Sequence, residues 1–347
     1  MPAAEAEAAE PLADDEIRDL LDPFSHQPKI LIAVSGGSDS FGMLAAFARW
    51  RRLDDTAPAL CVASVDHGLR PEAAQECATV MEAAARFGLP AATLRWEGEK
   101  PAASLQDAAR EARYRLLADH ARAVDATAVA TAHHREDQAE TVLMRLVRGS
   151  GPLGLKGMAA TSERHGVAIL RPFLWVAKAR LAATAAAAGL APVDDPSNAD
   201  DRFTRVRIRR LMPLLAAEGL DAQRLAILAG RMRMLDEALA HQVGIVMDRC
   251  RRPSIVPGTV VMDGSDWLDE PFAVVQQLLS RVLGEVAPEG ARERLEAVEG
   301  LAGAVLMAIA GGEALRQTLQ GALISVTADG RVIVAREPRR QSGRIPD

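Results

Sequence analysis

The stretch "ILIAVSGGSDSFG", residues 30–42, places a short apolar run directly before a small polar loop. Residues 30–34 are apolar and mostly β-branched, which is typical of a strand buried in a parallel sheet. After the loop, residues 41–50 ("FGMLAAFARW") return to the apolar spacing of a helix. A strand, a glycine-rich loop and a helix in this order predict an anion-binding site, because the first backbone N–H groups of a helix have no partner within it.

The loop itself favours phosphate as the anion. Its six residues are Ser35, Gly36, Gly37, Ser38, Asp39 and Ser40. The two glycines allow the backbone to approach a phosphate closely, and the three hydroxyl groups add donors. Asp39 would repel a bare phosphate, so its presence predicts that Mg²⁺ shares the site, with Asp39 as the metal ligand. A tight turn that caps a helix with serine is the simpler interpretation, and it would suffice for an isolated "SGG".

Two other nucleotide-binding motifs are excluded. A Walker A loop needs a lysine that reaches the outer phosphates, and this loop has none, which argues against transfer of the terminal phosphoryl group. A GxGxxG pattern occurs at Gly149, Gly151 and Gly154. It follows a predicted helix rather than a strand, so it lacks the context of a dinucleotide-binding fold.

The fold class follows from alternation along the chain. From residue 29 to about residue 213, short apolar or β-branched runs alternate with alanine-rich helical runs. This spacing predicts an α/β protein with a doubly wound parallel sheet and helices on both faces. Ligands of such sheets bind beyond the carboxyl ends of the strands, so the loops after Val34, Val65 and Ala132 are expected to converge on one site.

Three segments are expected along the chain. Residues 1–26 are acidic and alanine-rich and are interpreted as a disordered lead-in. Residues 27–213 are expected to form the α/β domain that carries the phosphate-binding loop. Residues 214–347 are predicted to form a mostly helical second domain that ends in a small β element. Its hairpin is expected around Asp329 and Gly330, because Asp-Gly between two alternating apolar runs is a strong turn signal.

Composition restricts the partners and the compartment. No apolar stretch is long enough to span a bilayer, and the first residues are not a secretory signal, so a cytoplasmic protein without membrane contact is expected. The three cysteines, Cys61, Cys77 and Cys250, are far apart, which favours neither disulfides nor a zinc site. The net charge is −6, yet residues 201–210 ("DRFTRVRIRR") gather five arginines into a local phosphate-binding surface. An arginine-rich codon usage would explain the number of arginines but not their clustering.

The loop resembles the pyrophosphate-binding loop of the N-type ATP pyrophosphatases, or PP-loop enzymes, which adenylate a substrate oxygen and release pyrophosphate. Other segments resemble the bacterial tRNA(Ile)-lysidine synthetase family. They are "VDHGLR" (65–70), "AREARYRLL" (109–117), "TAHHREDQAETVLMRLVRGSG" (131–151), "GLKGM" (154–158), "RPFL" (171–174) and "DDPSNADDRFTRVRIR" (194–209). Together they cover nearly all of residues 29–213 in the family's order.

The resemblance implies a specific ligation. ATP and Mg²⁺ would be the cofactors, and free L-lysine and a tRNA(Ile) with a CAU anticodon the partners. ATP adenylates the carbonyl oxygen of the wobble cytosine, and the ε-amino group of lysine then attacks that ring carbon and expels AMP. The second domain would contact the tRNA. The oligomeric state stays open, a homodimer included.

The resemblance also implies the catalytic residues, which are Asp137, Glu140, Arg113, His133 and Arg205. Asp137 and Glu140 lie three residues apart, on one face of the predicted helix, with His133 four residues before Asp137. A carboxylate pair near ATP can hold Mg²⁺, orient the lysine ammonium or take its proton. A solvated helix face is the alternative for these carboxylates, and a surface arginine is the alternative for Arg113. Beside the phosphates, Arg113 would stabilise the transition state.

The remaining polar positions of the motifs have less specific roles. Arg205 and Arg207 suit the tRNA backbone or the leaving pyrophosphate, and Arg209 and Arg210 suit the tRNA backbone. Asp66 and His67 end a predicted strand, where they would contact the nucleoside or form a turn. Many relatives carry asparagine where this chain has Val206, so the role of that segment stays open.

Three other functions would also use such a loop or an anion site. A tRNA thiolase of the same superfamily is the main alternative. Such enzymes generally need a catalytic cysteine pair or an iron–sulfur cluster bound by a CxxC motif, and this chain has no suitably spaced cysteines. A small-molecule amidotransferase would need an ammonia source, and no glutaminase segment is evident. A nucleotide-sensing or tRNA-binding module without activity is disfavoured by the intact loop, acidic cluster and Arg113.

Overall fold

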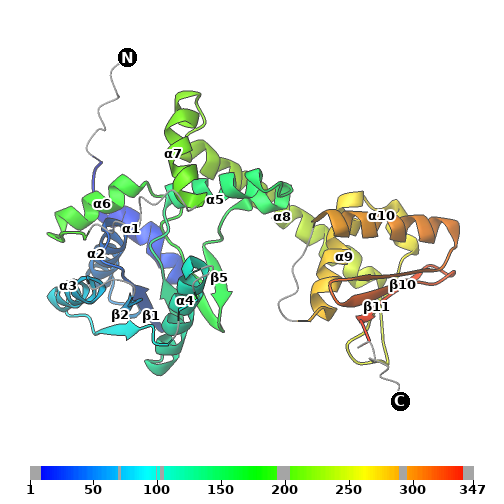
Figure 1. Ribbon diagram of the computed structural model, residues 1–347, viewed down its shortest axis with the longest axis horizontal. Coiled ribbons are helices and arrows are strands. Elements are labelled where there is room, and N and C mark those ends of the chain that lie inside the picture. Colours follow the sequence, from blue (N-terminus) through cyan, green and yellow to red (C-terminus); the bar gives the residue numbers. More distant parts are fainter. Residues whose placement is uncertain are drawn as a thin grey trace. The chain divides into compact units, whose positions relative to one another are not determined.

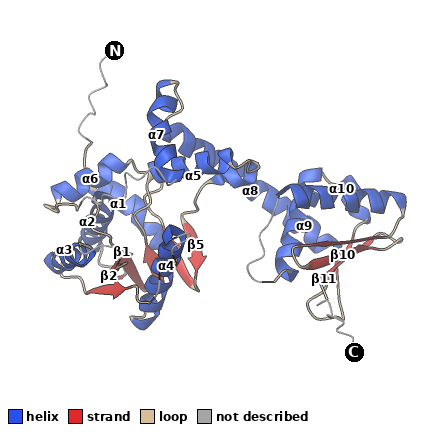
Figure 2. Ribbon diagram, in the orientation of Figure 1, coloured by secondary structure: helices blue, strands red, loops and turns tan. Residues whose placement is uncertain are grey.

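The computed structural model describes residues 9–68, 72–98, 100–101, 105–193, 204–288 and 295–338. The chain forms two compact units. Unit 1 comprises residues 1–149 and 154–230, and unit 2 comprises residues 150–153 and 231–347. Figures 1 and 2 show both, coloured along the sequence and by secondary structure.

Unit 1 is built around a six-stranded sheet with the order β3-β2-β1-β4-β6-β5. Its strands are β1 (Lys29–Ala33), β2 (Ala59–Asp66), β3 (Ala91–Arg95), β4 (Ala128–Ala130), β5 (Thr161–Arg164) and β6 (Val167–Leu170). The first five strands in this order pair in parallel, and β5 pairs antiparallel with β6 at the edge. The predicted parallel α/β sheet is therefore confirmed, with an antiparallel hairpin that the alternating pattern did not include.

Helices cover both faces of this sheet. The helices of this part of the chain are α1 (Asp14–Leu21), α2 (Ser38–Leu53), α3 (Ala73–Arg86), α4 (Leu105–Ala123), α5 (Arg135–Val147), α6 (Lys178–Ala187) and α7 (Thr204–Ala217), with the short 3₁₀ turns η1 (Asp22–Phe24) and η2 (Pro152–Lys156). Side chains alternate across the central strand, as period-two geometry requires. Ile30 and Ile32 face the core shared with α1, α2, α3 and α6, whereas Leu31 and Ala33 face α4.

The structure corrects the expected disorder at the N-terminus. Residues 14–21 form α1, whose apolar face carries the fully buried Ile17 and Leu21, and Leu12 just before it is also buried. The backbone N–H of Leu12 donates to Thr184 Oγ1 at 2.9 Å. These apolar side chains complete the core beside α2, and the acidic composition of the segment concealed them. Residues 1–8 lie outside the described residues.

The boundary between the two units also differs from the expected one at residues 213–214. Helix α7 runs through it with Pro213 inside the helix, and the units divide at Gly230, within α8 (Ala222–Cys250). Ile208 of α7 and Leu225 of α8 share a core cluster with Val142 of α5. Because these residues pack on α5, the segment up to residue 230 belongs to unit 1.

Unit 2 joins helices to an antiparallel sheet. It contains β7 (Arg251–Arg252), β8 (Val260–Asp263), the 3₁₀ turn η4 (Ser265–Asp269), α9 (Phe272–Val286), α10 (Leu295–Gly311), β9 (Leu315–Leu319), β10 (Ala322–Val326) and β11 (Arg331–Arg336). The sheet order is β7-β8-β11-β10-β9. The hairpin predicted at Asp329 and Gly330 is confirmed, since β10 and β11 pair across it and Gly330 has φ +81°. The three further strands were not predicted.

No helix in the described part of the chain has the length and apolar character that crossing a membrane requires.

Candidate active site

A pocket of about 480 Å³ opens beyond the carboxyl ends of the central strands of unit 1. Its wall includes Ser35 from the loop after β1, His67 from the loop after β2 and His133 from the loop after β4. The expected convergence of these three loops is therefore confirmed. Helices α2, α4, α5, α6 and α7 and the segment between β4 and α5 add further polar side chains to the wall.

The glycine-rich loop forms one side of the pocket. Gly36 has φ +86°, a backbone conformation that favours glycine, and its carbonyl accepts from the N–H of Val193 at 3.0 Å. Ser40 Oγ donates to the carbonyl of Gly37 at 2.9 Å and accepts from the N–H of Ser35 at 3.2 Å. These bonds hold the loop as a tight cradle at the start of α2. Ser35, Gly37, Asp39 and Ser40 line the pocket, whereas Gly36 and Ser38 are not among its wall residues.

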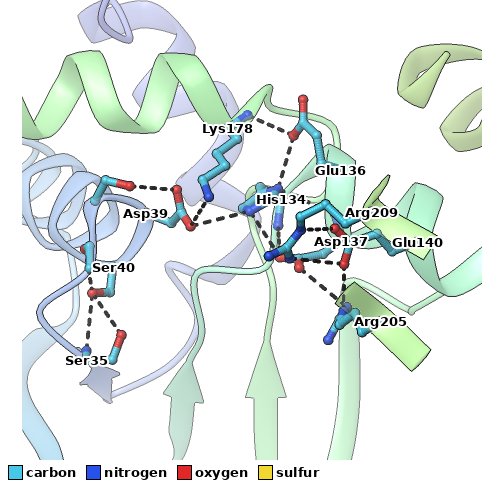
Figure 3. A network of polar contacts seen from close by, with 12 residues as sticks. Ser35, Asp39, Ser40, His134, Glu136, Asp137, Glu140, Lys178, Arg205 and Arg209 are labelled. Atoms are coloured by element: carbon cyan, nitrogen blue, oxygen red, sulfur yellow. Dashed lines mark hydrogen bonds and ion pairs between the residues drawn. The ribbon is translucent and has the colours of Figure 1, made fainter. Parts of the chain in front are cut away.

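The buried His134 joins the loop to α5 (Figure 3). Its Nε2 lies 3.5 Å from Asp39 Oδ2 and 3.3 Å from Asp137 Oδ2, and its Nδ1 lies 3.1 Å from Glu136 Oε2. Burial alone would lower the pKa of His134, but hydrogen bonds to Asp39 and Glu136 and the charge of Asp137 raise it to about 9. The imidazole is therefore cationic at neutral pH.

Asp39 in turn stays ionised inside the pocket. Burial opposes its ionisation, yet the hydrogen bond to His134 and the charges of His134 and Lys178 hold the pKa of Asp39 below its ordinary value. Sequence reasoning missed His134, although its position at the N-cap of an acidic first turn ("HRED") was a usable signal. It also missed Lys178, which the pocket wall includes.

Asp137 and Glu140 have different surroundings, although the sequence paired them. Asp137 lines the pocket. The side chain of Glu140 is only 2% exposed and accepts from Arg205 Nε at 2.7 Å and from Arg209 Nε at 2.8 Å. Arg205 also reaches Asp137 Oδ1, at 3.4 Å. Glu140 therefore positions two arginines of the wall, and Asp137 faces the space where a substrate would lie.

A cationic group of side chains forms the wall contributed by α4. Arg110, Arg113 and Tyr114 all line the pocket. The guanidinium groups of Arg110 and Arg164 lie 5.3 Å and 4.6 Å from the centre of the Tyr114 ring. Arg113 was predicted, and burial lowers the pKa of its guanidinium. Arg110 and Tyr114 were not predicted, although both stand in the segment "AREARYRLL".

His133 differs from its neighbour in charge. Burial and the nearby charges of Arg171 and Arg110 hold the pKa of His133 well below its ordinary value. Its Nδ1 lies 2.9 Å from Thr131 Oγ1. A neutral imidazole thus lines the pocket beside the cationic group, with one ring nitrogen that can donate a hydrogen bond and one that can accept a hydrogen bond.

The pocket wall offers few ligands for the expected Mg²⁺. Among the described residues, no group of three or more His, Cys, Asp or Glu side chains is arranged to hold a metal ion. Asp39 offers one carboxylate on the pocket wall. A single carboxylate fits Mg²⁺, because this ion is commonly held by one or two carboxylates together with substrate phosphates.

The other expected positions are divided between the pocket and its surroundings. Asp66 is buried and accepts from the N–H of Gly68 at 2.7 Å, so it shapes the turn after β2. Arg209 lines the pocket, whereas Arg207, Arg210 and Val206 are not among its wall residues. Residues 194–203, which hold part of the arginine-rich motif, lie outside the described residues.

Comparison with known proteins identifies a family and several similar proteins for this chain. A protein family described as "PP-loop domain" matches residues 9–215. The chain is 47% identical to a tRNA(Ile)-lysidine synthase of Methylobacterium nodulans, over 97% of this chain and 99% of that protein. It is also 47% identical to a tRNA(Ile)-lysidine synthase of Rhodopseudomonas palustris, over 97% of this chain and 98% of that protein.

Among solved structures, a U34-tRNA thiolase of Methanococcus maripaludis shares the fold. The TM-score is 0.53 at 16% identity, with 64% of this chain and 78% of that chain covered. At this identity the likeness concerns the fold of the chain alone.

Proposed function

This chain belongs to the tRNA(Ile)-lysidine synthase family of PP-loop proteins, and we propose that it ligates free L-lysine to the wobble cytidine of a tRNA(Ile) with a CAU anticodon. ATP would be cleaved to AMP and pyrophosphate. One observation carries the proposal: the glycine-rich loop, the carboxylate of Asp137 and the arginines of α4 and α7 line one pocket. Such a pocket can bind a triphosphate on one side and a nucleobase and an amine on the other.

In the first step, the carbonyl oxygen of the cytosine attacks the α-phosphorus of ATP. A new P–O bond forms, the bond between the α-phosphorus and the bridging oxygen breaks, and pyrophosphate leaves with that electron pair. The loop amides and the hydroxyls of Ser35 and Ser40 would bind the outer phosphates. Arg113 would offset the charge that develops on the α-phosphate. Mg²⁺ bound by Asp39 would supply further positive charge to the phosphates.

In the second step, lysine replaces the activated oxygen. Its ε-ammonium must first lose a proton, because only the neutral amine has a free electron pair. Asp137 lies on the wall with its carboxylate fixed by His134 and Arg205, so it would orient the ammonium and accept the proton. The amine then attacks the ring carbon, the C–O bond breaks, and AMP leaves. Neutral His133 lies in the same pocket, where it would hydrogen-bond to a substrate without taking a positive charge.

The three cysteines of the chain argue against the alternative function, a tRNA thiolase. Cys61, Cys77 and Cys250 are all free and buried. Burial raises the pKa of each of the three thiols, which disfavours the reactive thiolate form. They lie far apart in the sequence, without a pair that could carry sulfur or hold a cluster.

The test is a labelling assay with purified protein, ATP, Mg²⁺, radiolabelled lysine and tRNA transcripts. We expect label in a CAU-anticodon tRNA(Ile), with AMP and pyrophosphate formed in equal amounts, and none when the wobble cytidine is replaced by uridine. Label that ignores the anticodon, or no label at all, would overturn the assignment. Since tRNA and free lysine are the proposed substrates, we expect the protein to act in the cytoplasm.

A further inference from the structure

The glycine-rich loop lacks a cation of its own. Its six residues contain one charged side chain, the carboxylate of Asp39, and no lysine or arginine. The triphosphate of ATP is strongly anionic, and bringing it beside a carboxylate in a half-enclosed pocket is unfavourable without nearby positive charge. The cationic His134 lies 3.5 Å from Asp39 and offsets part of this charge. A further cation from elsewhere in the chain would favour the triphosphate on this side of the pocket.

Lys178 is placed to do so. It is the first residue of α6 and lies on the pocket wall, with Nζ 3.8 Å from Asp39 Oδ2 (Figure 3). Its side chain is 49% exposed, so the ammonium group can reach a ligand in the pocket. The separation from Asp39 exceeds a normal hydrogen bond, and such a half-exposed ion pair contributes little to stability.

Two contacts fix the backbone of Lys178 while its ammonium stays accessible. The backbone N–H of Lys178 donates to Glu136 Oε2 at 2.8 Å, and the same oxygen lies 3.1 Å from His134 Nδ1. Gly42 of α2 packs directly on the backbone of Leu181, since a Cβ at Gly42 would lie 2.7 Å from the Leu181 carbonyl carbon. Lys178 and Asp39 each lie three residues before this contact, on α6 and α2 respectively. The close packing therefore brings them together.

Helix stability does not explain a lysine at this position. The first turn of a helix disfavours positive charge, because the macrodipole is positive there, and α6 has no acidic residue in its first turn. A cation at this end of the helix raises the positive potential on the loop side of the pocket. This arrangement is suited to an anion in the pocket.

We propose that Lys178 is the phosphate-binding lysine of this site, supplied by α6 instead of by the loop. Its ammonium binds the β- and γ-phosphates of ATP and remains in contact with the pyrophosphate that leaves. This role rests on the proposed use of ATP but not on the identity of the tRNA or of the amine.

The test is calorimetric titration of the full chain with Mg²⁺-ATP, pyrophosphate and AMP, in the absence of tRNA and lysine. In Lys178→Met we expect the affinity for ATP and for pyrophosphate to fall about 10- to 100-fold, the range for losing a charged hydrogen bond, and the affinity for AMP to stay unchanged. Lys178→Arg should recover most of the loss. Arg52→Met, which removes one positive charge from the last turn of α2, is the matched control and should bind all three ligands normally.

Two results would overturn the role of Lys178. One is an ATP affinity of Lys178→Met within twofold of the unaltered protein. The other is an equal loss of AMP and ATP binding that Lys178→Arg does not restore, which would indicate a structural role. Failure of the proposed function is separate: the unaltered protein would then bind ATP in a Lys178-dependent manner and attach no lysine to tRNA.

Discussion

Replacing Gly42 with alanine should loosen the packing of α2 on α6 and weaken nucleotide binding at the same time. An added Cβ would lie 2.7 Å from the carbonyl carbon and 2.9 Å from the Cα of Leu181, and closer still to the carbonyl oxygen. Ordinary contacts of a Cβ begin at 3.4 Å. Because the opposing atoms are backbone, no side chain can rotate away, and the two helices must separate.

The magnitude follows from two opposing effects. Overpacking in a core costs about 1–3 kcal/mol, and a clash with backbone lies at the upper end of this range. Alanine in place of glycine within a helix stabilises the folded state by about 1 kcal/mol. A net loss of about 2 kcal/mol lowers the melting temperature by about 4–8 °C for a unit of this size. Displacement of α6 also moves Lys178 away from Asp39, so the affinity for ATP should fall severalfold.

Thermal unfolding followed by circular dichroism and calorimetric titration with Mg²⁺-ATP measure the two effects. Gly284→Ala is the matched control, because Gly284 lies inside α9 and an added Cβ meets nothing within 4 Å. It should leave ATP binding unchanged and stabilise the chain by up to about 1 kcal/mol. A Gly42→Ala protein that is as stable as the unaltered chain and binds ATP equally well would refute the reasoning.

Three further predictions concern carboxylates. Asp137→Asn should abolish transfer of labelled lysine while ATP binding and the circular dichroism spectrum stay unchanged, and near-normal transfer would remove Asp137 from the catalytic residues. Glu140→Gln weakens the hydrogen bonds to both arginine partners, so the free energy of unfolding in urea should fall by about 1–3 kcal/mol. An unchanged unfolding midpoint would contradict this prediction. The bidentate hydrogen bonds of Arg180 hold the pKa of Glu16 at about 2, below its ordinary 4.5, so this stabilisation is present above pH 4.5 and disappears as the pH falls towards 2. Urea unfolding across that range should show a shallower decline in Arg180→Gln, and an identical decline in both proteins would argue against the pair.

Local signals made the centre of unit 1 predictable. The apolar run of β1, the glycines after it and the helix that follows are adjacent in the sequence, so their order alone indicates the loop and its anion site. The parallel sheet then follows from the alternation of elements. Ligands of parallel sheets bind beyond the carboxyl ends of the strands, and this alone predicts that Ser35 and His133 line one pocket. No knowledge of side-chain contacts is needed for that prediction.

Contacts between distant segments could not be predicted in this way. Lys178 and His134 both meet Asp39, but neither residue type is distinctive, and their partner is far away in the sequence. Glu140 shows the same limit: spacing indicates that it shares a helix face with Asp137, whereas its burial depends on Arg205 and Arg209 of α7 lying over it. Composition also misled the interpretation of α1, because a few apolar residues in an acidic segment were enough to dock it.

The docking of α1 has a practical consequence for handling the protein. Leu12, Ile17 and Leu21 are buried against α2. A truncated protein that begins at Lys29 would expose the apolar side chains that they cover, and we expect it to aggregate. A purification tag attached ahead of Glu10 leaves these contacts intact. Limited proteolysis would report the difference, since a seated α1 shields its peptide bonds from trypsin.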